Sequence, residues 1–205
     1  MAKTNIYMRI TAIKQQVKDH SRYSVFVDDV FSFGLSESAL IDSGIKKGQD
    51  ITEEELIAYK DTSLLDIGYN KALGLIARRL RSEWEIREYL KTKEYDPEQI
   101  DQIIERLIKR NWLDDNKFAT MWAENRRQLK SASHRRISQE LKIKRVPEDI
   151  IRSVLEADDH DDISMLGELV VRKRRQTRYQ DDQKLLAYLI RQGYNYQDVK
   201  QALNI

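Results

Sequence analysis

Residues 82–95 read SEWEIREYLKTKEY, and the pattern of this stretch decides the fold. Ser82 with Glu85 three residues later forms a capping box, the sequence signature of a helix start. Ile86 and Leu90 then share one face of the helix, because side chains four residues apart lie on one side of it. The stretch predicts a short helix with one apolar face.

The same pattern returns twice further along the chain. Residues 133–146 read SHRRISQELKIKRV and residues 181–194 read DDQKLLAYLIRQGY, so that Leu90, Leu141 and Leu189 correspond at steps of 51 and 48 residues. The positions four residues before and five, ten and fourteen residues after each leucine are also apolar or aromatic. Three units of three helices are predicted. Because units of this size have little core of their own, we expect them to stack into an elongated, curved array.

Capping residues indicate the helix boundaries. Asp96 and the proline after it open the third helix of the first unit, and Asp114 caps the first helix of the second unit. Gly193 stands where a helix end favours a left-handed residue, whereas Glu94 and Arg145 occupy the equivalent positions. Because non-glycine residues tolerate that conformation poorly, these two turns are expected to differ in shape.

The first 60 residues have a different sequence pattern from the helical repeats. Residues 9–17, 23–27 and 30–33 alternate or are rich in β-branched and aromatic side chains, which predicts a short antiparallel meander. A capping box at Thr52 opens a helix expected to end near Tyr59. The predicted fold class is therefore mainly α, a tandem array of three three-helix repeats preceded by a small α+β N-terminal module. The expected divisions are 1–62 for the module and 63–113, 114–158 and 159–205 for the three repeats.

Composition excludes several classes of protein. The chain has 205 residues, 40% hydrophobic and 34% charged, and no apolar run approaches the roughly 18 to 20 residues that a membrane span needs. The first residues lack the apolar stretch of a signal peptide, so a cytoplasmic location without membrane contact is expected. There is no cysteine, and the three histidines are scattered, which argues against redox chemistry and zinc binding.

Enzyme chemistry is not indicated. The seven glycines form no phosphate-binding loop, so no nucleotide cofactor is expected. Paired acids such as Asp114-Asp115 could ligate a metal or act in acid–base catalysis, but near helix starts they are more often caps. No catalytic, cofactor-binding or metal-binding residue is predicted.

The strongest functional signal is a pair of basic blocks. Residues 125–139 and 169–180 each carry five basic side chains and no acid. Such clusters bind phosphates through counterion release, and they serve equally well against an acidic protein groove, so charge leaves both partners open. The candidate partner-binding or DNA-binding residues are Arg126, Arg127, Lys130, Arg135, Arg136, Arg172, Lys173, Arg174, Arg175 and Arg178.

The sequence also allows two other interpretations. Tryptophans and tyrosines could stack on single-stranded bases, but most fall at or beside apolar repeat positions, which favours core packing. A three-helix unit also suggests a helix-turn-helix DNA reader. The third helix of the first unit, however, exposes Glu98, Asp101 and Glu105, and carboxylates facing phosphates are unfavourable.

From about residue 68 to the end, the chain resembles the RecX family, regulators of the bacterial recombinase RecA. The matching residues of the second unit are Leu113-Asp114-Asp115, Phe118-Ala119, Trp122 and Arg126, followed by Arg136-Ile137 and Glu140-Leu141. The first unit matches at Arg79, Ser82, Glu85, Ile86 and Leu90, and the third at Gly193-Tyr194 and Asp198-Val199. The chain departs from the family at Ser131-Ala132-Ser133, where glycines are usual.

The resemblance implies a non-enzymatic monomer that lies along the groove of the RecA filament on single-stranded DNA and inhibits the recombinase, in DNA repair and the SOS response. Contact with the DNA phosphate backbone is also implied as an option. The leading rival is a direct nucleic-acid-binding protein with helix-turn-helix-like units, acting in transcription or repair. A scaffold for another protein partner is a third possibility.

Overall fold

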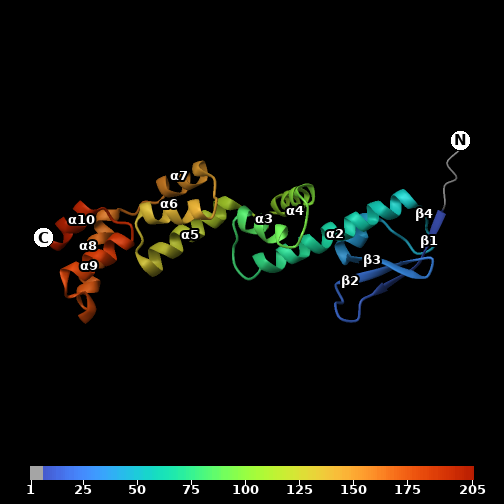
Figure 1. Ribbon diagram of the computed structural model, residues 1–205, viewed down its shortest axis with the longest axis horizontal. Helices are drawn as coiled ribbons and strands as arrows, with labels where there is room; N and C mark the ends of the chain where they lie inside the picture. The colour runs from blue at the N-terminus through green and yellow to red at the C-terminus, as the bar shows by residue number, and fades with distance from the viewer. Residues whose placement is uncertain (1–6) are drawn as a thin grey trace. The chain divides into compact units, whose positions relative to one another are not determined.

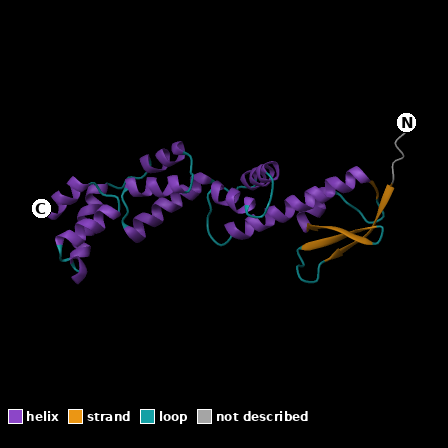
Figure 2. Ribbon diagram, viewed as in Figure 1, coloured by secondary structure: helices purple, strands orange, loops and turns teal. Residues whose placement is uncertain are grey.

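The computed structural model describes residues 7–205 (Figures 1 and 2). Residues 1–6, which the sequence analysis judged unlike a signal peptide, lie outside the described residues. The elements in chain order are β1 Tyr7–Gln15, β2 Arg22–Val27, β3 Val30–Ser36, α1 Glu37–Ser43, β4 Asp50–Thr52, α2 Glu53–Ile76, α3 Glu83–Lys91, α4 Pro97–Lys109, α5 Asp115–Lys130, α6 His134–Ile143, α7 Glu148–Glu156, α8 Asp162–Arg174, the 3-10 turn η1 Thr177–Tyr179, α9 Asp182–Arg191 and α10 Tyr196–Leu203. The predicted mainly helical fold with a small N-terminal sheet is confirmed.

The described chain forms two compact units. The first comprises the residues up to Arg79 together with Arg87–Trp112, and the second comprises Leu80–Ile86 together with Leu113–Ile205. The first unit thus holds the sheet, α1, α2 and α4, the second holds α5 to α10, and α3 contributes to both.

The sheet of the first unit has four antiparallel strands in the order β3-β2-β1-β4. The predicted meander is its first three strands. The three-residue strand β4, which pairs with the start of β1, was not predicted, because so short a segment has no readable alternation. Ile10, Val25, Leu35 and Ile51 are fully buried and form the centre of the core.

Helix α2 runs unbroken from Glu53 to Ile76, so the predicted end near Tyr59 is wrong. The capping box at its start is present as predicted. The polar residues that follow Tyr59 look like a loop in sequence but bind the sheet. Ser63 donates to the carbonyl of Gly34 at 2.6 Å, and the fully buried Asp66 accepts the backbone N–H and the hydroxyl of Ser36 at 2.8 and 2.6 Å. Tertiary bonds therefore hold α2 helical through this stretch.

The repeat pattern read from the sequence matches the buried positions of the helices. Leu90, Leu141 and Leu189 are fully buried in α3, α6 and α9, as are the residues four positions before each of them. The three-helix repeats are the end of α2 with α3 and α4, then α5 to α7, and then α8 to α10. The last two repeats have their own clusters of buried side chains.

The turns after α3, α6 and α9 are alike, so the expectation that two of them differ in shape is wrong. Glu94 and Arg145 take positive φ angles of 63° and 56°, in the same left-handed region as Gly193 at 93°. In each case the next residue donates its N–H to the carbonyl of the repeat leucine, at 3.2 to 3.4 Å. This closure satisfies a helix-end carbonyl in every repeat and outweighs the cost of the left-handed residue.

Within the second unit, one hydrogen bond recurs at equivalent positions of successive repeats. Ser82, the N-cap of α3, donates its hydroxyl to the carbonyl of Lys144 after α6, at 2.9 Å. Ser133, the N-cap of α6, donates in the same way to the carbonyl of Gln192 after α9, at 3.2 Å. The N-terminus of each middle helix thus binds the C-terminus of the next one.

A second bond recurs beside the first. The N–H of Glu83 donates to Asp115 at 2.8 Å, and the N–H of His134 donates to Asp162 at 3.0 Å. In each acid pair the first aspartate, Asp114 or Asp161, caps its own helix, while the second caps the middle helix of the preceding repeat. The first joint is defined here as Ser82, Glu83, Asp115 and Lys144, and the second joint as Ser133, His134, Asp162 and Gln192.

Candidate interaction surface

Two residues of the first basic block bind one carboxylate, together with a tryptophan that precedes the block. Arg126 and Arg136 donate from Nε to the two oxygens of Glu140, at 2.5 and 2.9 Å, and Trp122 donates its indole N–H to the same group at 3.0 Å. Burial disfavours the charged carboxylate, but these bonds and charges outweigh it and hold the pKa of Glu140 below its ordinary value. Both arginines are therefore fixed in place, and Arg136 remains 45% exposed.

Sequence reasoning missed Lys144 as a member of this surface. The guanidinium of Arg126 lies 4.3 Å from the centre of the Trp122 ring system, and the ammonium of Lys144 lies 5.5 Å from it. Lys144 also pairs with Glu85 at 2.7 Å. Trp122 stands four residues before Arg126 on α5, so their contact could be predicted from helical spacing. The contact of Lys144 with Trp122 depends on tertiary packing and could not be predicted in this way.

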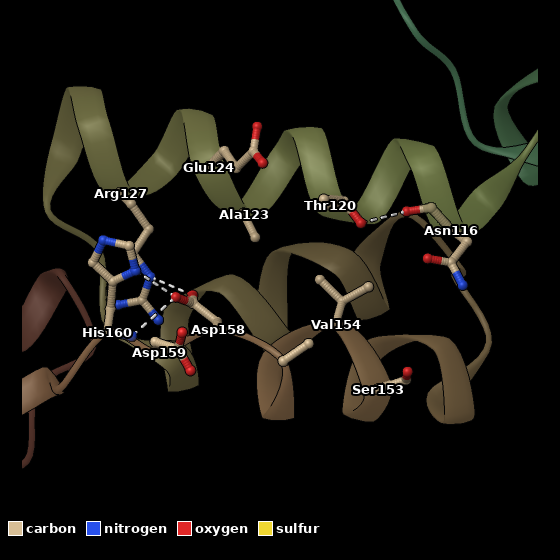
Figure 3. A pocket seen from close by; sticks show the side chains of 11 residues that line it. Asn116, Thr120, Ala123, Glu124, Arg127, Ser153, Val154, Asp158, Asp159 and His160 are labelled. Atoms are coloured by element: carbon tan, nitrogen blue, oxygen red, sulfur yellow. Dashed lines mark hydrogen bonds and ion pairs between the residues drawn. The ribbon is translucent and has the colours of Figure 1, made fainter.

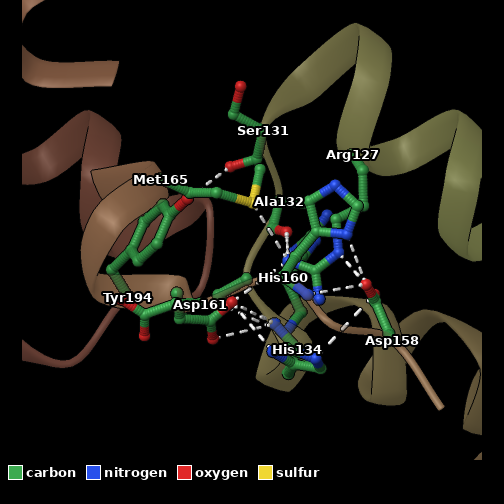
Figure 4. A network of polar contacts seen from close by, with 12 residues as sticks. Arg127, Ser131, Ala132, His134, Asp158, His160, Asp161, Met165 and Tyr194 are labelled. Carbon is green, nitrogen blue, oxygen red and sulfur yellow. Dashed lines mark hydrogen bonds and ion pairs between the residues drawn. The ribbon is translucent and has the colours of Figure 1, made fainter. Parts of the chain in front are cut away.

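Arg127 is buried, and Figure 4 shows its guanidinium beside Asp158. Its side chain is 3% exposed, and its guanidinium pairs with Asp158 at 2.7 Å and with Asp162 at 3.1 Å. The prediction that Arg127 contacts a partner rests on its place in a run of basic residues. Its side chain instead points into the second joint, where a buried guanidinium needs paired carboxylates.

Further ionisable groups lie around the second joint. His134 places Nδ1 2.9 Å from Asp162, and His160 places Nδ1 2.5 Å from Asp158. Burial alone would raise the pKa of Asp158, but hydrogen bonds from His160 and Arg127 lower it below the ordinary value. Tyr194 donates its hydroxyl to the carbonyl of Ser131 at 2.9 Å, and burial raises the pKa of Tyr194 to about 12.

The second basic block contacts the middle of the first. Arg172 of α8 donates to the hydroxyl of Ser131 at 2.6 Å, immediately after Lys130. Lys173 lies over the rings of Tyr179 and Tyr188, at 5.4 and 4.8 Å from their centres. Arg174 pairs with Asp182 and donates to the carbonyl of Gln180. Arg175 and Arg178 are exposed, and Arg178 lies near the Tyr179 ring. The contact of Arg172 with Ser131 brings the two blocks together.

Three of the ten predicted cations are exposed and form no ion pair, ring contact or side-chain hydrogen bond within residues 7–205. These are Lys130, Arg135 and Arg175. Together with the exposed Arg136 and Arg178 they are called the basic surface below. The aromatic reading is mixed, because Tyr95 and Tyr194 are buried, whereas Trp84 and Trp112 are 37% and 54% exposed.

The described residues give no sign of a metal centre or of a membrane span. No group of three or more His, Cys, Asp or Glu side chains in residues 7–205 could hold a metal ion. Among the helices described, none combines the length and the apolar character needed to cross a bilayer.

Solved structures share this fold. The chain aligns with a crystal structure described as regulatory protein RecX with a TM-score of 0.73 and 22% identity, covering 97% of this chain and all of the other. The crystal structure of RecX from Lactobacillus salivarius aligns with a TM-score of 0.57 and 19% identity, over 68% of this chain and 94% of the other. The fold and the surface together define a helical-repeat protein with paired N-cap joints and a basic surface.

Sequence comparisons identify the family. Residues 8–52 match the model of the regulatory protein RecX N-terminal domain, residues 69–107 that of the first RecX three-helix domain, and residues 114–155 that of the second. The regulatory protein RecX of Listeria welshimeri is 31% identical over 202 residues, which cover 95% of this chain and 74% of the relative. That of Oceanobacillus iheyensis is 32% identical over 178 residues, or 84% of this chain and 65% of the relative. The chain belongs to the RecX family of regulatory proteins.

Proposed function

We propose that the protein binds the RecA filament on single-stranded DNA along its groove, in the cytoplasm, and inhibits the recombinase by occupying that groove without any bond chemistry. Membership of the RecX family supports the partner. The observation that carries the proposal is the contact of Arg172 with Ser131, because it brings the two basic blocks next to each other. Two adjoining basic blocks suit a long anionic polymer.

The cations divide into two roles in this proposal. Lys130, Arg135 and Arg175 have no ion pair within the described chain, so they lose none on binding a phosphate or an acidic side chain. Arg126 and Arg136 are held by Glu140 and position the surface. Arg127 maintains the joint and is assigned no partner contact.

The test is DNA-dependent ATP hydrolysis by the cognate recombinase with and without the protein. The proposal expects the rate of hydrolysis to fall as the protein saturates the filament. An unchanged rate of ATP hydrolysis at saturating ratios would contradict the proposed inhibition.

Direct binding of nucleic acid without the recombinase is the alternative, and the free cations of the basic surface favour it equally. It predicts that the chain retards DNA alone, and that a defined duplex competes better than a random one if the helix-turn-helix reading holds. On α4, the helix that such a reader would insert, Arg106 lies over Tyr69 at 4.3 Å and near Asp42 at 3.9 Å. This contact leaves Arg106 poorly placed to read bases.

A further inference from the structure

The exposed side of α5 carries two adjoining hollows. One has a volume of about 390 Å³ and lies between α5 and α7 (Figure 3). The other has a volume of about 600 Å³ and lies beside the start of α5, next to Leu80 and Met121. Asn116 and Thr120 line both. The two hollows are called the α5 groove below.

Five of the residues that line the α5 groove are apolar, and two of these are alanines. Ala123 of α5 and Val154 of α7 face each other across the first hollow in Figure 3, and Ala157 lines its end. Leu80 and Met121 are 40% and 53% exposed beside the second hollow. Small side chains along a groove let the backbone of a partner helix approach closely, and exposed apolar ones supply the area that it would bury.

The charge of the α5 groove is opposite to that of the basic surface. The first hollow is lined by three carboxylates, those of Glu124, Asp158 and Asp159, and by one guanidinium, that of Arg127. Asp158 already pairs with Arg127, whereas Glu124 and Asp159 are exposed and form no ion pair with the residues in 7–205. The groove therefore has unpaired negative charge at this end.

One buried donor at the same end lacks an acceptor. Nη2 of Arg127 is buried and has no hydrogen-bond partner among the described residues, although the other guanidinium nitrogens are bonded. A buried N–H without an acceptor is costly, so native structures supply one from water or from a bound molecule. His160 also lines this end of the groove and is 59% exposed, with its Nδ1 2.5 Å from Asp158.

We propose that the α5 groove binds an amphipathic helix of a protein partner, with apolar residues packed on Met121 and Val154 and a lysine or arginine beside Asp159. The length of the groove suits a short helix. It follows α5 from Asn116 to Arg127, a span of about 17 Å, which equals three helical turns. This proposal concerns a different surface from the one that meets the filament.

The probe for the test is an acetylated 15-residue peptide of leucine and lysine with leucines at helical spacing, and its counterpart has glutamate in place of lysine. Both are titrated into the full chain, with binding measured by calorimetry and mapped by amide chemical shifts. The lysine peptide should bind about tenfold more tightly than the glutamate peptide at low salt, and its shifts should fall on α5 and α7. Equal binding of the two peptides, or shifts confined to other helices, would overturn the proposal.

Two pairs of variants sharpen the test. Thr120→Trp fills both hollows, and its matched control Asn125→Trp places the same ring on α5 outside them. The first should weaken the lysine peptide about tenfold and the second should leave it unchanged, as expected for a blocked groove. Equal effects of the two variants would contradict the proposal.

The charge pair is tested separately. Glu124→Gln with Asp159→Asn should weaken the lysine peptide about fivefold, since exposed ion pairs are individually weak. Glu105→Gln with Glu168→Gln removes two exposed carboxylates elsewhere and should have no effect. If both double variants bind the peptide as the original chain does, the cationic partner is excluded.

Discussion

The hydroxyl of Ser133 donates a hydrogen bond to the carbonyl oxygen of Gln192, 3.2 Å away, while accepting the backbone N–H of Arg136 at 3.3 Å. One side chain therefore caps its own helix and holds the next repeat. Its counterpart Ser82 does the same with Lys144 and Glu85. The hydrogen bonds that start each middle helix are thus inseparable from those that link the repeats.

Removing the Ser133 hydroxyl should lower the stability of the fold more than removing a simple N-cap does. Ser133→Ala is expected to lower the free energy of unfolding by about 1 to 2 kcal/mol, because an N-cap and one of two hydrogen bonds to the carbonyl of Gln192 are lost together. The backbone N–H of Ser133 still donates to that carbonyl at 3.1 Å. The measurement is urea unfolding followed by circular dichroism. Ser138→Ala, in the middle of the same helix, is the control and should change stability by less than about 0.5 kcal/mol. A similar loss in both variants would mean that the joint contributes nothing.

Glycine should stabilise the chain at the two left-handed turns that lack it. Glu94→Gly and Arg145→Gly are each expected to raise the free energy of unfolding by up to about 1 kcal/mol, because glycine removes the steric cost of positive φ. Thermal unfolding is a sufficient assay. The control Lys91→Gly lies within α3 and should destabilise. Destabilisation by all three would show that the side chains at the turns matter more than their φ angles.

Gly193 is constrained by a neighbour as well as by its φ angle. A Cβ atom there would lie 2.5 Å from Oγ of Ser133 and 2.6 Å from Cβ of Arg136, so Gly193→Ala should open the second joint and cost about 3 kcal/mol. Gly44 has a similar φ of 66° with nothing within 4 Å of such an atom. Gly44→Ala should therefore cost only about 1 kcal/mol, from the left-handed conformation alone. Equal losses of unfolding free energy in the two variants would show that the close contact of Gly193 with Ser133 and Arg136 does not matter.

Stability should fall at high pH through Tyr194. Its pKa is raised by burial from the ordinary 10 to about 12, so the folded chain holds this proton more tightly than the unfolded chain. The stabilisation is complete below pH 10 and is lost as the pH rises toward 12, by roughly 2 to 3 kcal/mol. Urea midpoints between pH 9 and pH 12 measure it. In Tyr194→Phe this part of the pH dependence should disappear, and an unchanged slope would place the titration elsewhere.

The sequence predicted the helical repeats well because their information is local. Leucines at repeat spacing and capping residues such as Asp96 and Asp114 act within one helix, and the structure has them as expected. The joints could not be read in this way. Asp115 and Asp162 look like second caps of their own helices, yet they bind residues 32 and 28 positions earlier.

The candidate site was predicted in outline only. Exposed members such as Lys130 and Arg135 lie at positions where a charge run is solvated. Arg127 stands in the same run but is buried against Asp158 and Asp162. Its burial could not be predicted, because these partners are 31 and 35 residues further along the chain. The two blocks were seen as separate, and their meeting at Ser131 depends on how the third repeat packs on the second.

Binding to RecA filaments on single-stranded DNA tests the central claim most directly. Filaments are titrated with the chain and with the triple variant Lys130→Glu, Arg135→Glu, Arg175→Glu, and bound protein is measured by co-sedimentation at several salt concentrations. The account predicts at least a tenfold loss of affinity and a shallower salt dependence for this variant, because three contacts to anions are reversed. The matched variant Lys60→Glu, Lys71→Glu, Lys109→Glu reverses three exposed lysines of the first unit and should bind as the original chain does. Equal affinity of the two triple variants would contradict the account.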